Sequence, residues 1–197
     1  MKTNDRPDAQ RRRELNPHRT LLESLFHELF QTERSAEIHS PKEAERLGDT
    51  APARALRAVA HHATSVSSEL PNLAASRGLP VSKVGSAIGD AFSMTRRLFT
   101  DPVMESERSY RATLLGMRHG LDLVRLIRAT ADAGGDSDLV AWCTEWLSIR
   151  EPLVEEVCSQ LEWFGWHPEP ATKHPAGVKG FFKRMLAGGP GPSGGAV

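Results

Sequence analysis

The 197-residue sequence lacks any long apolar run. Its longest one, at residues 139–143, is far shorter than the roughly 20 apolar residues that span a bilayer. Residues 1–16 are polar and are followed by no hydrophobic stretch of the kind found in secretory signals. We therefore expect a cytoplasmic protein with neither a transmembrane segment nor a secretory signal.

Cysteine is also scarce. Cys143 and Cys158 fall in one predicted helix, where fifteen residues correspond to about 22 Å between Cα atoms. A disulfide requires Cα atoms within about 7 Å, so these two thiols do not pair with each other while the helix is intact. Two free thiols suit a reducing compartment, and their apolar neighbours are typical of core cysteines.

Several catalytic motifs are missing from the chain. It has no Gly-x-Gly-x-x-Gly, no P-loop and no Cys-x-x-Cys, so the sequence gives no support to dehydrogenase, kinase or hydrolase activity. It also has no alternating β-branched run bounded by turns and no repeat of fixed period. These absences predict an all-α protein.

The net charge of zero hides an uneven distribution. Residues 1–15 carry +2 and residues 171–197 carry +4, which leaves −6 for the part between them. An acidic body argues against a surface specific for nucleic acid. The basic ends could still contact anionic partners, although solubilising tails are the simpler interpretation.

Capping residues and helical spacing of apolar residues divide the chain into helices. We expect a flexible N-terminus at 1–15, a helical domain at 16–167 and a Pro/Gly-rich tail at 168–197. Four long helices, one additional helix in the middle connection and mostly short loops predict a four-helix bundle with a crossover. The first predicted helix begins near residue 17, and a short one at 40–48 opens with Ser40 as its cap. The next runs over 50–78 with Thr50 as its cap and a kink at Pro71. Further helices are expected at 82–100, at 101–135 and at 136–164, the last with Asp136 or Ser137 as its cap.

The order of the predicted helices and their residue pattern over 17–165 resemble the ferritin-like superfamily, especially its small bacterial members. The blocks at 21–37, 56–73, 107–126 and 139–164 carry this resemblance. It implies a ferritin-like bundle and, at its centre, an iron or manganese pair with oxidase or iron-handling chemistry.

Polar residues on the apolar lines of the helices are the candidate metal ligands. Each long helix places at least one carboxylate at or near its inner face, and one helix adds a histidine. Buried carboxylates are costly unless they are paired, protonated or metal-bound, and hard divalent ions prefer oxygen ligands. The candidate ligands are Glu33, His62, Glu69, Glu107 and Glu156.

Spacing argues against the familiar version of such a site. Ferritin-like metal centres use a Glu-x-x-His pair on two helices, and the chain contains none. The alternative is that the glutamates pair with arginines such as Arg34, Arg54, Arg111 or Arg150, or lie exposed at the edges of the seams.

The tail contains an apolar and basic island at 178–186, set between linker-like stretches. Such a segment can bind a partner groove, lie on an anionic membrane or fold back on its own bundle. The residues expected to bind a partner are Val178, Phe181, Phe182, Lys183, Arg184, Met185 and Leu186.

The sequence thus favours a non-enzymatic helical bundle that acts in protein association, through a tethered C-terminal docking segment or by self-association. The alternative is a divergent ferritin-like protein with an iron or manganese pair.

Overall fold

The computed structural model describes residues 17–80 and 105–172, and every element within these ranges is helical. The all-α prediction is confirmed for this part of the chain. The segment expected at 82–100, the N-terminus at 1–15 and the docking island at 178–186 lie outside the described residues. The helices are α2 (Pro17–Leu47), α3 (Ala51–Ala75), α5 (Ser106–Ala133), α6 (Ser137–Ser159), α7 (Leu161–Trp166) and α8 (Pro168–Ala171).

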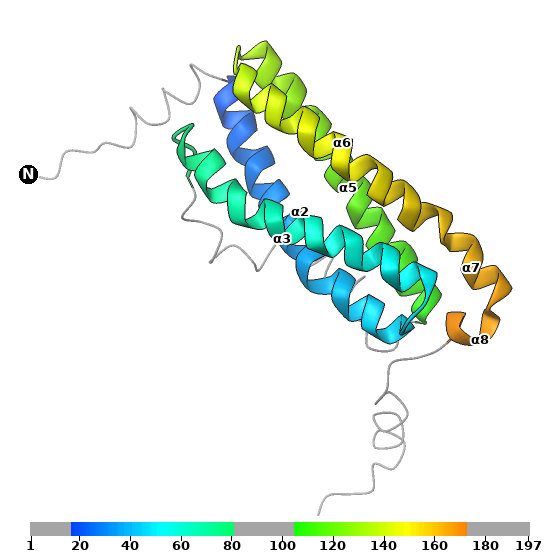
Figure 1. Cartoon of the computed structure of the whole chain (residues 1–197). Helices are drawn as coiled ribbons and strands as arrows, with labels where there is room; N and C mark the ends of the chain where they lie inside the picture. The colour runs from blue at the N-terminus through cyan, green and yellow to red at the C-terminus, as the bar shows by residue number, and fades with distance from the viewer. Residues whose placement is uncertain (1–16, 81–104, 173–197) are drawn as a thin grey trace, which may run out of the picture.

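The four long helices lie side by side (Figure 1). Helix α2 packs against α3 and α5, and α6 packs against α5 and α3, so each long helix has two neighbours. The C-terminal end of α2 meets the N-terminal end of α5 where the Ser109 hydroxyl donates to the Glu43 carboxylate at 2.6 Å. At the opposite end, Arg77 after α3 binds the Asp136 carboxylate before α6, at 2.6 and 3.0 Å. Helix α3 therefore ends, and α5 begins, at opposite ends of the molecule.

The predicted caps account for most helix boundaries. The Thr50 hydroxyl accepts a hydrogen bond from the Ala53 amide at the start of α3, and the Asp136 carboxylate accepts one from the Leu139 amide at the start of α6. Gly48 follows α2 with φ +72°, a left-handed conformation that a residue with a Cβ adopts only with strain.

Two predicted boundaries are wrong. The structure has no helix start at Ser40, because α2 continues through Pro41 to Leu47. The Pro41 ring is exposed, while Ser40 and Glu43 are buried, so packing of this turn keeps the helix continuous despite the missing amide. The last helix breaks at Gln160, one turn after the Val157 carbonyl accepts a hydrogen bond from the Tyr110 hydroxyl at 2.9 Å.

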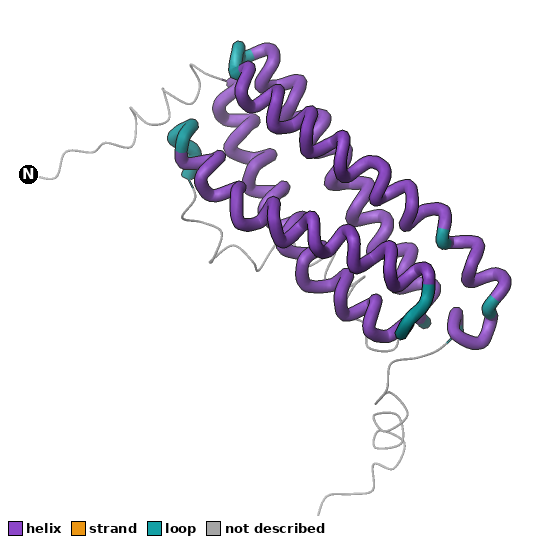
Figure 2. The backbone as a smooth tube through the Cα atoms, in the orientation of Figure 1, coloured by secondary structure: helices purple, strands orange, loops and turns teal. Residues whose placement is uncertain are grey.

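The C-terminal end of the described chain is more ordered than the sequence suggests. Residues 168–171, expected to belong to the tail, form the short helix α8, and Ala171 is buried (Figure 2). Proline at the first position of a helix loses no intrahelical hydrogen bond, and Pro168 occupies that position.

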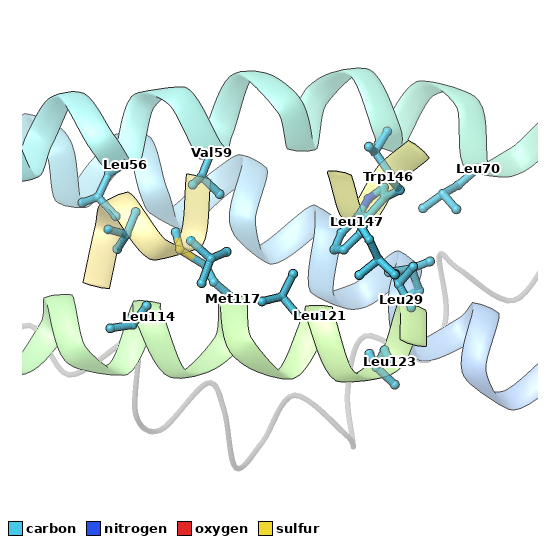
Figure 3. Close-up of a cluster of buried hydrophobic side chains, with 14 of the residues drawn as sticks. Leu29, Leu56, Val59, Leu70, Leu114, Met117, Leu121, Leu123, Trp146 and Leu147 are labelled. Atoms are coloured by element: carbon cyan, nitrogen blue, oxygen red, sulfur yellow. The ribbon is translucent and has the colours of Figure 1, made fainter. Parts of the chain in front are cut away.

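The core runs along the space enclosed by the four long helices (Figure 3). Each of them contributes large apolar side chains that are almost completely buried, which supplies the main driving force for folding. Representative residues are Leu29 of α2, Leu56, Val59 and Leu70 of α3, Leu114, Met117 and Leu121 of α5, and Trp146 and Leu147 of α6.

Candidate functional site

A buried ion pair crosses the interior between α2 and α6. Arg150 Nη2 donates to Glu33 Oε2 at 2.5 Å, and the two side chains are 3% and 2% exposed. Burial raises the pKa of Glu33, although the charge and hydrogen bond of Arg150 oppose this, and burial lowers the pKa of Arg150. Each charge makes the other tolerable in the low-dielectric interior, so the pair behaves as one unit.

Arg150 contacts one aromatic ring, which in turn contacts a second. Its guanidinium carbon lies 5.0 Å from the centre of the Trp146 ring, a cation–π contact between residues four apart on α6. The Trp146 ring also lies tilted at 50° to the His62 ring of α3, with 5.9 Å between ring centres. A line of polar and aromatic groups thus joins α3, α6 and α2.

Three nitrogen atoms along this line are buried and have no hydrogen-bond partner among the described residues: His62 Nδ1, Trp146 Nε1 and Arg150 Nε. The tryptophan and arginine atoms are obligatory donors. A buried donor without an acceptor costs roughly 1–3 kcal/mol. Two such donors on adjoining side chains mark a place where an added acceptor would be stabilising.

His62 is uncharged at neutral pH. Burial lowers its pKa from 6.5 to about 4, and the nearby positive charge of Arg150 acts in the same direction. A protonated imidazole here would lie near a guanidinium without a carboxylate partner of its own.

A cleft of about 330 Å³ lies between α2 and α5, with Trp146, Arg150 and Glu33 among its lining residues. This volume is at the small end of the range for small-molecule sites. The walls are mostly small or polar residues: Ser24, His27, Glu28, Gln31, Thr32, Ser35, Ala36 and His39 on α2, and Thr113, Gly116, Met117, His119 and Gly120 on α5.

Two contacts join the walls of the cleft. The His119 ring Nε2 lies 2.8 Å from the Glu28 carboxylate, and both side chains are about half exposed. A Cβ added at Gly120 would lie 3.2 Å from the Thr32 methyl, so the two helices approach closely there because residue 120 has no side chain.

The structure does not bring the five predicted metal ligands together. Glu33 is bound to Arg150, and Glu107 is bound by Arg111, four residues further along α5. Glu69 is exposed and accepts a hydrogen bond from the Ser65 hydroxyl at 3.0 Å.

Glu156 is also exposed, and it accepts a hydrogen bond from the Gln160 amide at 2.8 Å. Within residues 17–80 and 105–172, no three His, Cys, Asp or Glu side chains are placed to hold one metal ion. The four glutamates therefore follow the alternative that the sequence left open, ion pairing for two of them and exposure for the other two.

Helical periodicity identified Glu33 and His62 as inward-facing but did not indicate the cleft. Gly116 and Gly120, four residues apart on the predicted helix, are the signal that could have revealed it, because small residues at that spacing lie on one helix face. The half-exposed wall of α2 has no comparable signal, since its histidines and Gln31 resemble ordinary surface residues.

Another buried carboxylate escaped the sequence analysis. Glu43 Oε2 accepts hydrogen bonds from the Ser109 hydroxyl at 2.6 Å and from Arg46 at 2.8 Å. Glu43 Oε1 and the Ser40 hydroxyl have no hydrogen-bond partner within residues 17–80 and 105–172. Burial raises the pKa of Glu43. The hydrogen bond between Ser109 and Glu43 joins the end of α2 to the start of α5.

Comparison with known proteins finds no matching family model, no matching curated protein and no matching solved structure. Among the described helices, none combines the length and apolar character needed to cross a membrane.

Proposed function

We propose that this protein binds a small molecule in the cleft between α2 and α5. The observation that carries the proposal is the cluster of unpartnered buried nitrogen atoms on His62, Trp146 and Arg150, two of which belong to residues that line the cleft. Unpaired buried donors are costly in a core that is otherwise well packed. A ligand that supplies an acceptor removes that cost and gains binding energy from it.

The buried charge supports binding at this cleft in preference to metal chemistry at the bundle centre. Arg150 occupies the position beside Glu33 where a cation is needed. Glu33 therefore has its counter-charge without a metal ion.

A variant that fills the cleft tests this proposal. Ala36 lines the cleft on α2, so Ala36→Phe should occupy its volume without altering Trp146 or Arg150. Fragments that raise the melting temperature of the wild type should lose this effect in Ala36→Phe, because a bound ligand stabilises only the folded state. The matched control is Ala129→Phe at an exposed position of α5 outside the cleft. Equal stabilisation of all three proteins would contradict the proposal.

We also propose that the bundle is ferritin-like in layout. Four long helices with antiparallel neighbours, and a connection that must join opposite ends of α3 and α5, support this arrangement. At the centre of this layout the described residues place the Glu33–Arg150 ion pair.

Association through the C-terminal island at 178–186 is a second candidate function. It is supported by Trp166 near the end of the described chain, which is 79% exposed and presents a large apolar surface. The full-length Phe181→Ser/Phe182→Ser variant should lose self-association or partner capture by crosslinking. A variant with two serines at Gly194 and Gly195 is the control, and identical crosslinks in all proteins would contradict a docking role.

A further inference from the structure

The charge and hydrogen-bonding groups of the cleft specify a ligand class, and this inference rests on the proposed function. Among the cleft residues, Arg150 is the one arginine or lysine, and its charge is balanced by Glu33. Glu28 adds a second carboxylate at the mouth, next to His119. Apart from its histidines, the cleft therefore has no excess positive charge that would bind an anion.

The buried N–H donors at the cleft require a hydrogen-bond acceptor. Trp146 Nε1 and Arg150 Nε both carry a hydrogen that is donated to no other group among the described residues. Both residues line the cleft, and a ligand oxygen placed against them would accept from both donors. A ligand with donors alone would leave both unpaired.

The volume and walls of the cleft limit the ligand to a small molecule. Gly116 and Gly120, one turn apart on α5, add no side chain to the wall, and Gly120 lies close to Thr32 of α2. Met117 adds an apolar surface. A cleft of about 330 Å³ is at the small end of the range for small-molecule sites.

We propose that the cleft binds a small, uncharged molecule whose carbonyl oxygen accepts hydrogen bonds from Trp146 Nε1 and Arg150 Nε. An aromatic amide or a lactam-type heterocycle has this chemistry. A carboxylate of the same shape places a second negative charge beside Glu33, which is costly away from water. An amidinium of the same shape places its own N–H donors against the N–H donors of Trp146 and Arg150. It also brings a positive charge close to that of Arg150, so both contacts are unfavourable.

Three probes of nearly identical shape separate these classes: benzamide, benzoate and benzamidine. We expect calorimetric titration at neutral pH to show benzamide binding about tenfold tighter than either charged probe, in line with the loss of one paired hydrogen bond or more. Trp146→Phe keeps an aromatic ring but removes the donor, and should weaken benzamide binding about tenfold. Trp142→Phe, at a position on α6 outside the cleft, is the matched control and should leave binding unchanged.

The shift of the Trp146 indole N–H resonance on addition of benzamide gives a second measurement that needs no variant. Benzoate or benzamidine binding as tightly as benzamide would overturn the ligand class but leave a binding cleft in place. Absence of benzamide binding, or binding unchanged by Trp146→Phe, would also overturn it. Failure of the cleft itself is recognised separately, because every fragment would then stabilise Ala36→Phe as much as the wild type.

Discussion

Arg150 Nη2 lies 2.5 Å from Glu33 Oε2, in a contact between residues 117 positions apart. The two residues come from α6 and α2, which are diagonal across the bundle, since each packs instead against α3 and α5. The pair therefore spans the centre of the interior. A contact of this kind constrains both the depth and the rotation of the two helices, because both side chains lose their partner if either helix turns.

Removing one member of the pair should be strongly destabilising. Arg150→Met leaves the Glu33 carboxylate buried without its counter-charge, and we expect the free energy of unfolding to fall by about 3 kcal/mol or more. The double variant Glu33→Met/Arg150→Met should recover most of that loss, because no buried charge remains. Denaturant unfolding of the three proteins checks this prediction.

The exposed pair between Arg34 and Glu37 is the matched control. Its arginine side chain is 64% exposed, and Arg34→Met should change the free energy of unfolding by less than about 1 kcal/mol. A double variant at positions 33 and 150 that is as unstable as Arg150→Met would contradict the pairing argument.

His62 should make stability depend on pH in the acidic range. The unfolded chain takes up a proton at this residue near pH 6.5, whereas the folded protein does so only near its lowered pKa of about 4. The unfolded state therefore binds more protons between these values, and the contribution of His62 to stability falls as pH decreases from 6.5 to 4. His62→Gln should lack this contribution.

The difference between the wild-type and His62→Gln unfolding curves, measured at several pH values, isolates the histidine from Glu33 and Glu43. Those carboxylates have raised pKa values and act in the opposite direction. His61→Gln, at the exposed neighbouring position, is the control. A pH-independent difference between wild type and His62→Gln would show that His62 is not buried as described.

Tyr110 should remain un-ionised in the folded protein at alkaline pH. Burial raises its pKa well above 10, and the nearby Glu156 and Cys158 act in the same direction. It is the single tyrosine of the chain, so tyrosinate absorbance reports on it alone. The absorbance should rise only when circular dichroism shows unfolding, and a rise near pH 10 with the helices intact would contradict the buried hydrogen bond to Val157.

Metal content separates the ion-pair account from the metal alternative. Because Glu33 has Arg150 as its partner and Glu69, Glu107 and Glu156 lie elsewhere, we expect protein purified without chelators to contain no stoichiometric iron, manganese or zinc. Elemental analysis measures this directly. One equivalent of metal that is lost in Glu33→Gln would contradict the account.

Local signals in the sequence predict the helices well. Thr50 and Asp136 cap helices as predicted, because capping depends on a side chain and an amide three residues away. The continuation of α2 through Pro41 depends on burial of Ser40 and Glu43 against another helix, and the break at Gln160 coincides with a contact from Tyr110. Those outcomes are set by tertiary packing, which the local pattern does not contain.

In the candidate site, too, the local pattern predicts some features and tertiary packing decides the others. Periodicity places Glu33 and His62 on inner faces, and the structure buries Glu33 completely and His62 in part. Which arginine reaches Glu33 depends on how α6 sits relative to α2, so Arg150 was one of several candidates. The cleft lies between two glycines of α5 and small residues of α2. The spacing of Gly116 and Gly120 marks one wall, but the identity of the facing wall depends on a contact between distant segments.

The most direct test of the cleft is nuclear magnetic resonance of the side-chain N–H groups of Trp146 and Arg150, observed while fragments are added. The account predicts that benzamide and related carbonyl compounds shift both resonances, leave the indole signal of the exposed Trp166 unchanged, and lose their effect in Ala36→Phe. Trp146 and Arg150 resonances that no fragment moves, or shifts confined to Trp166, would contradict it.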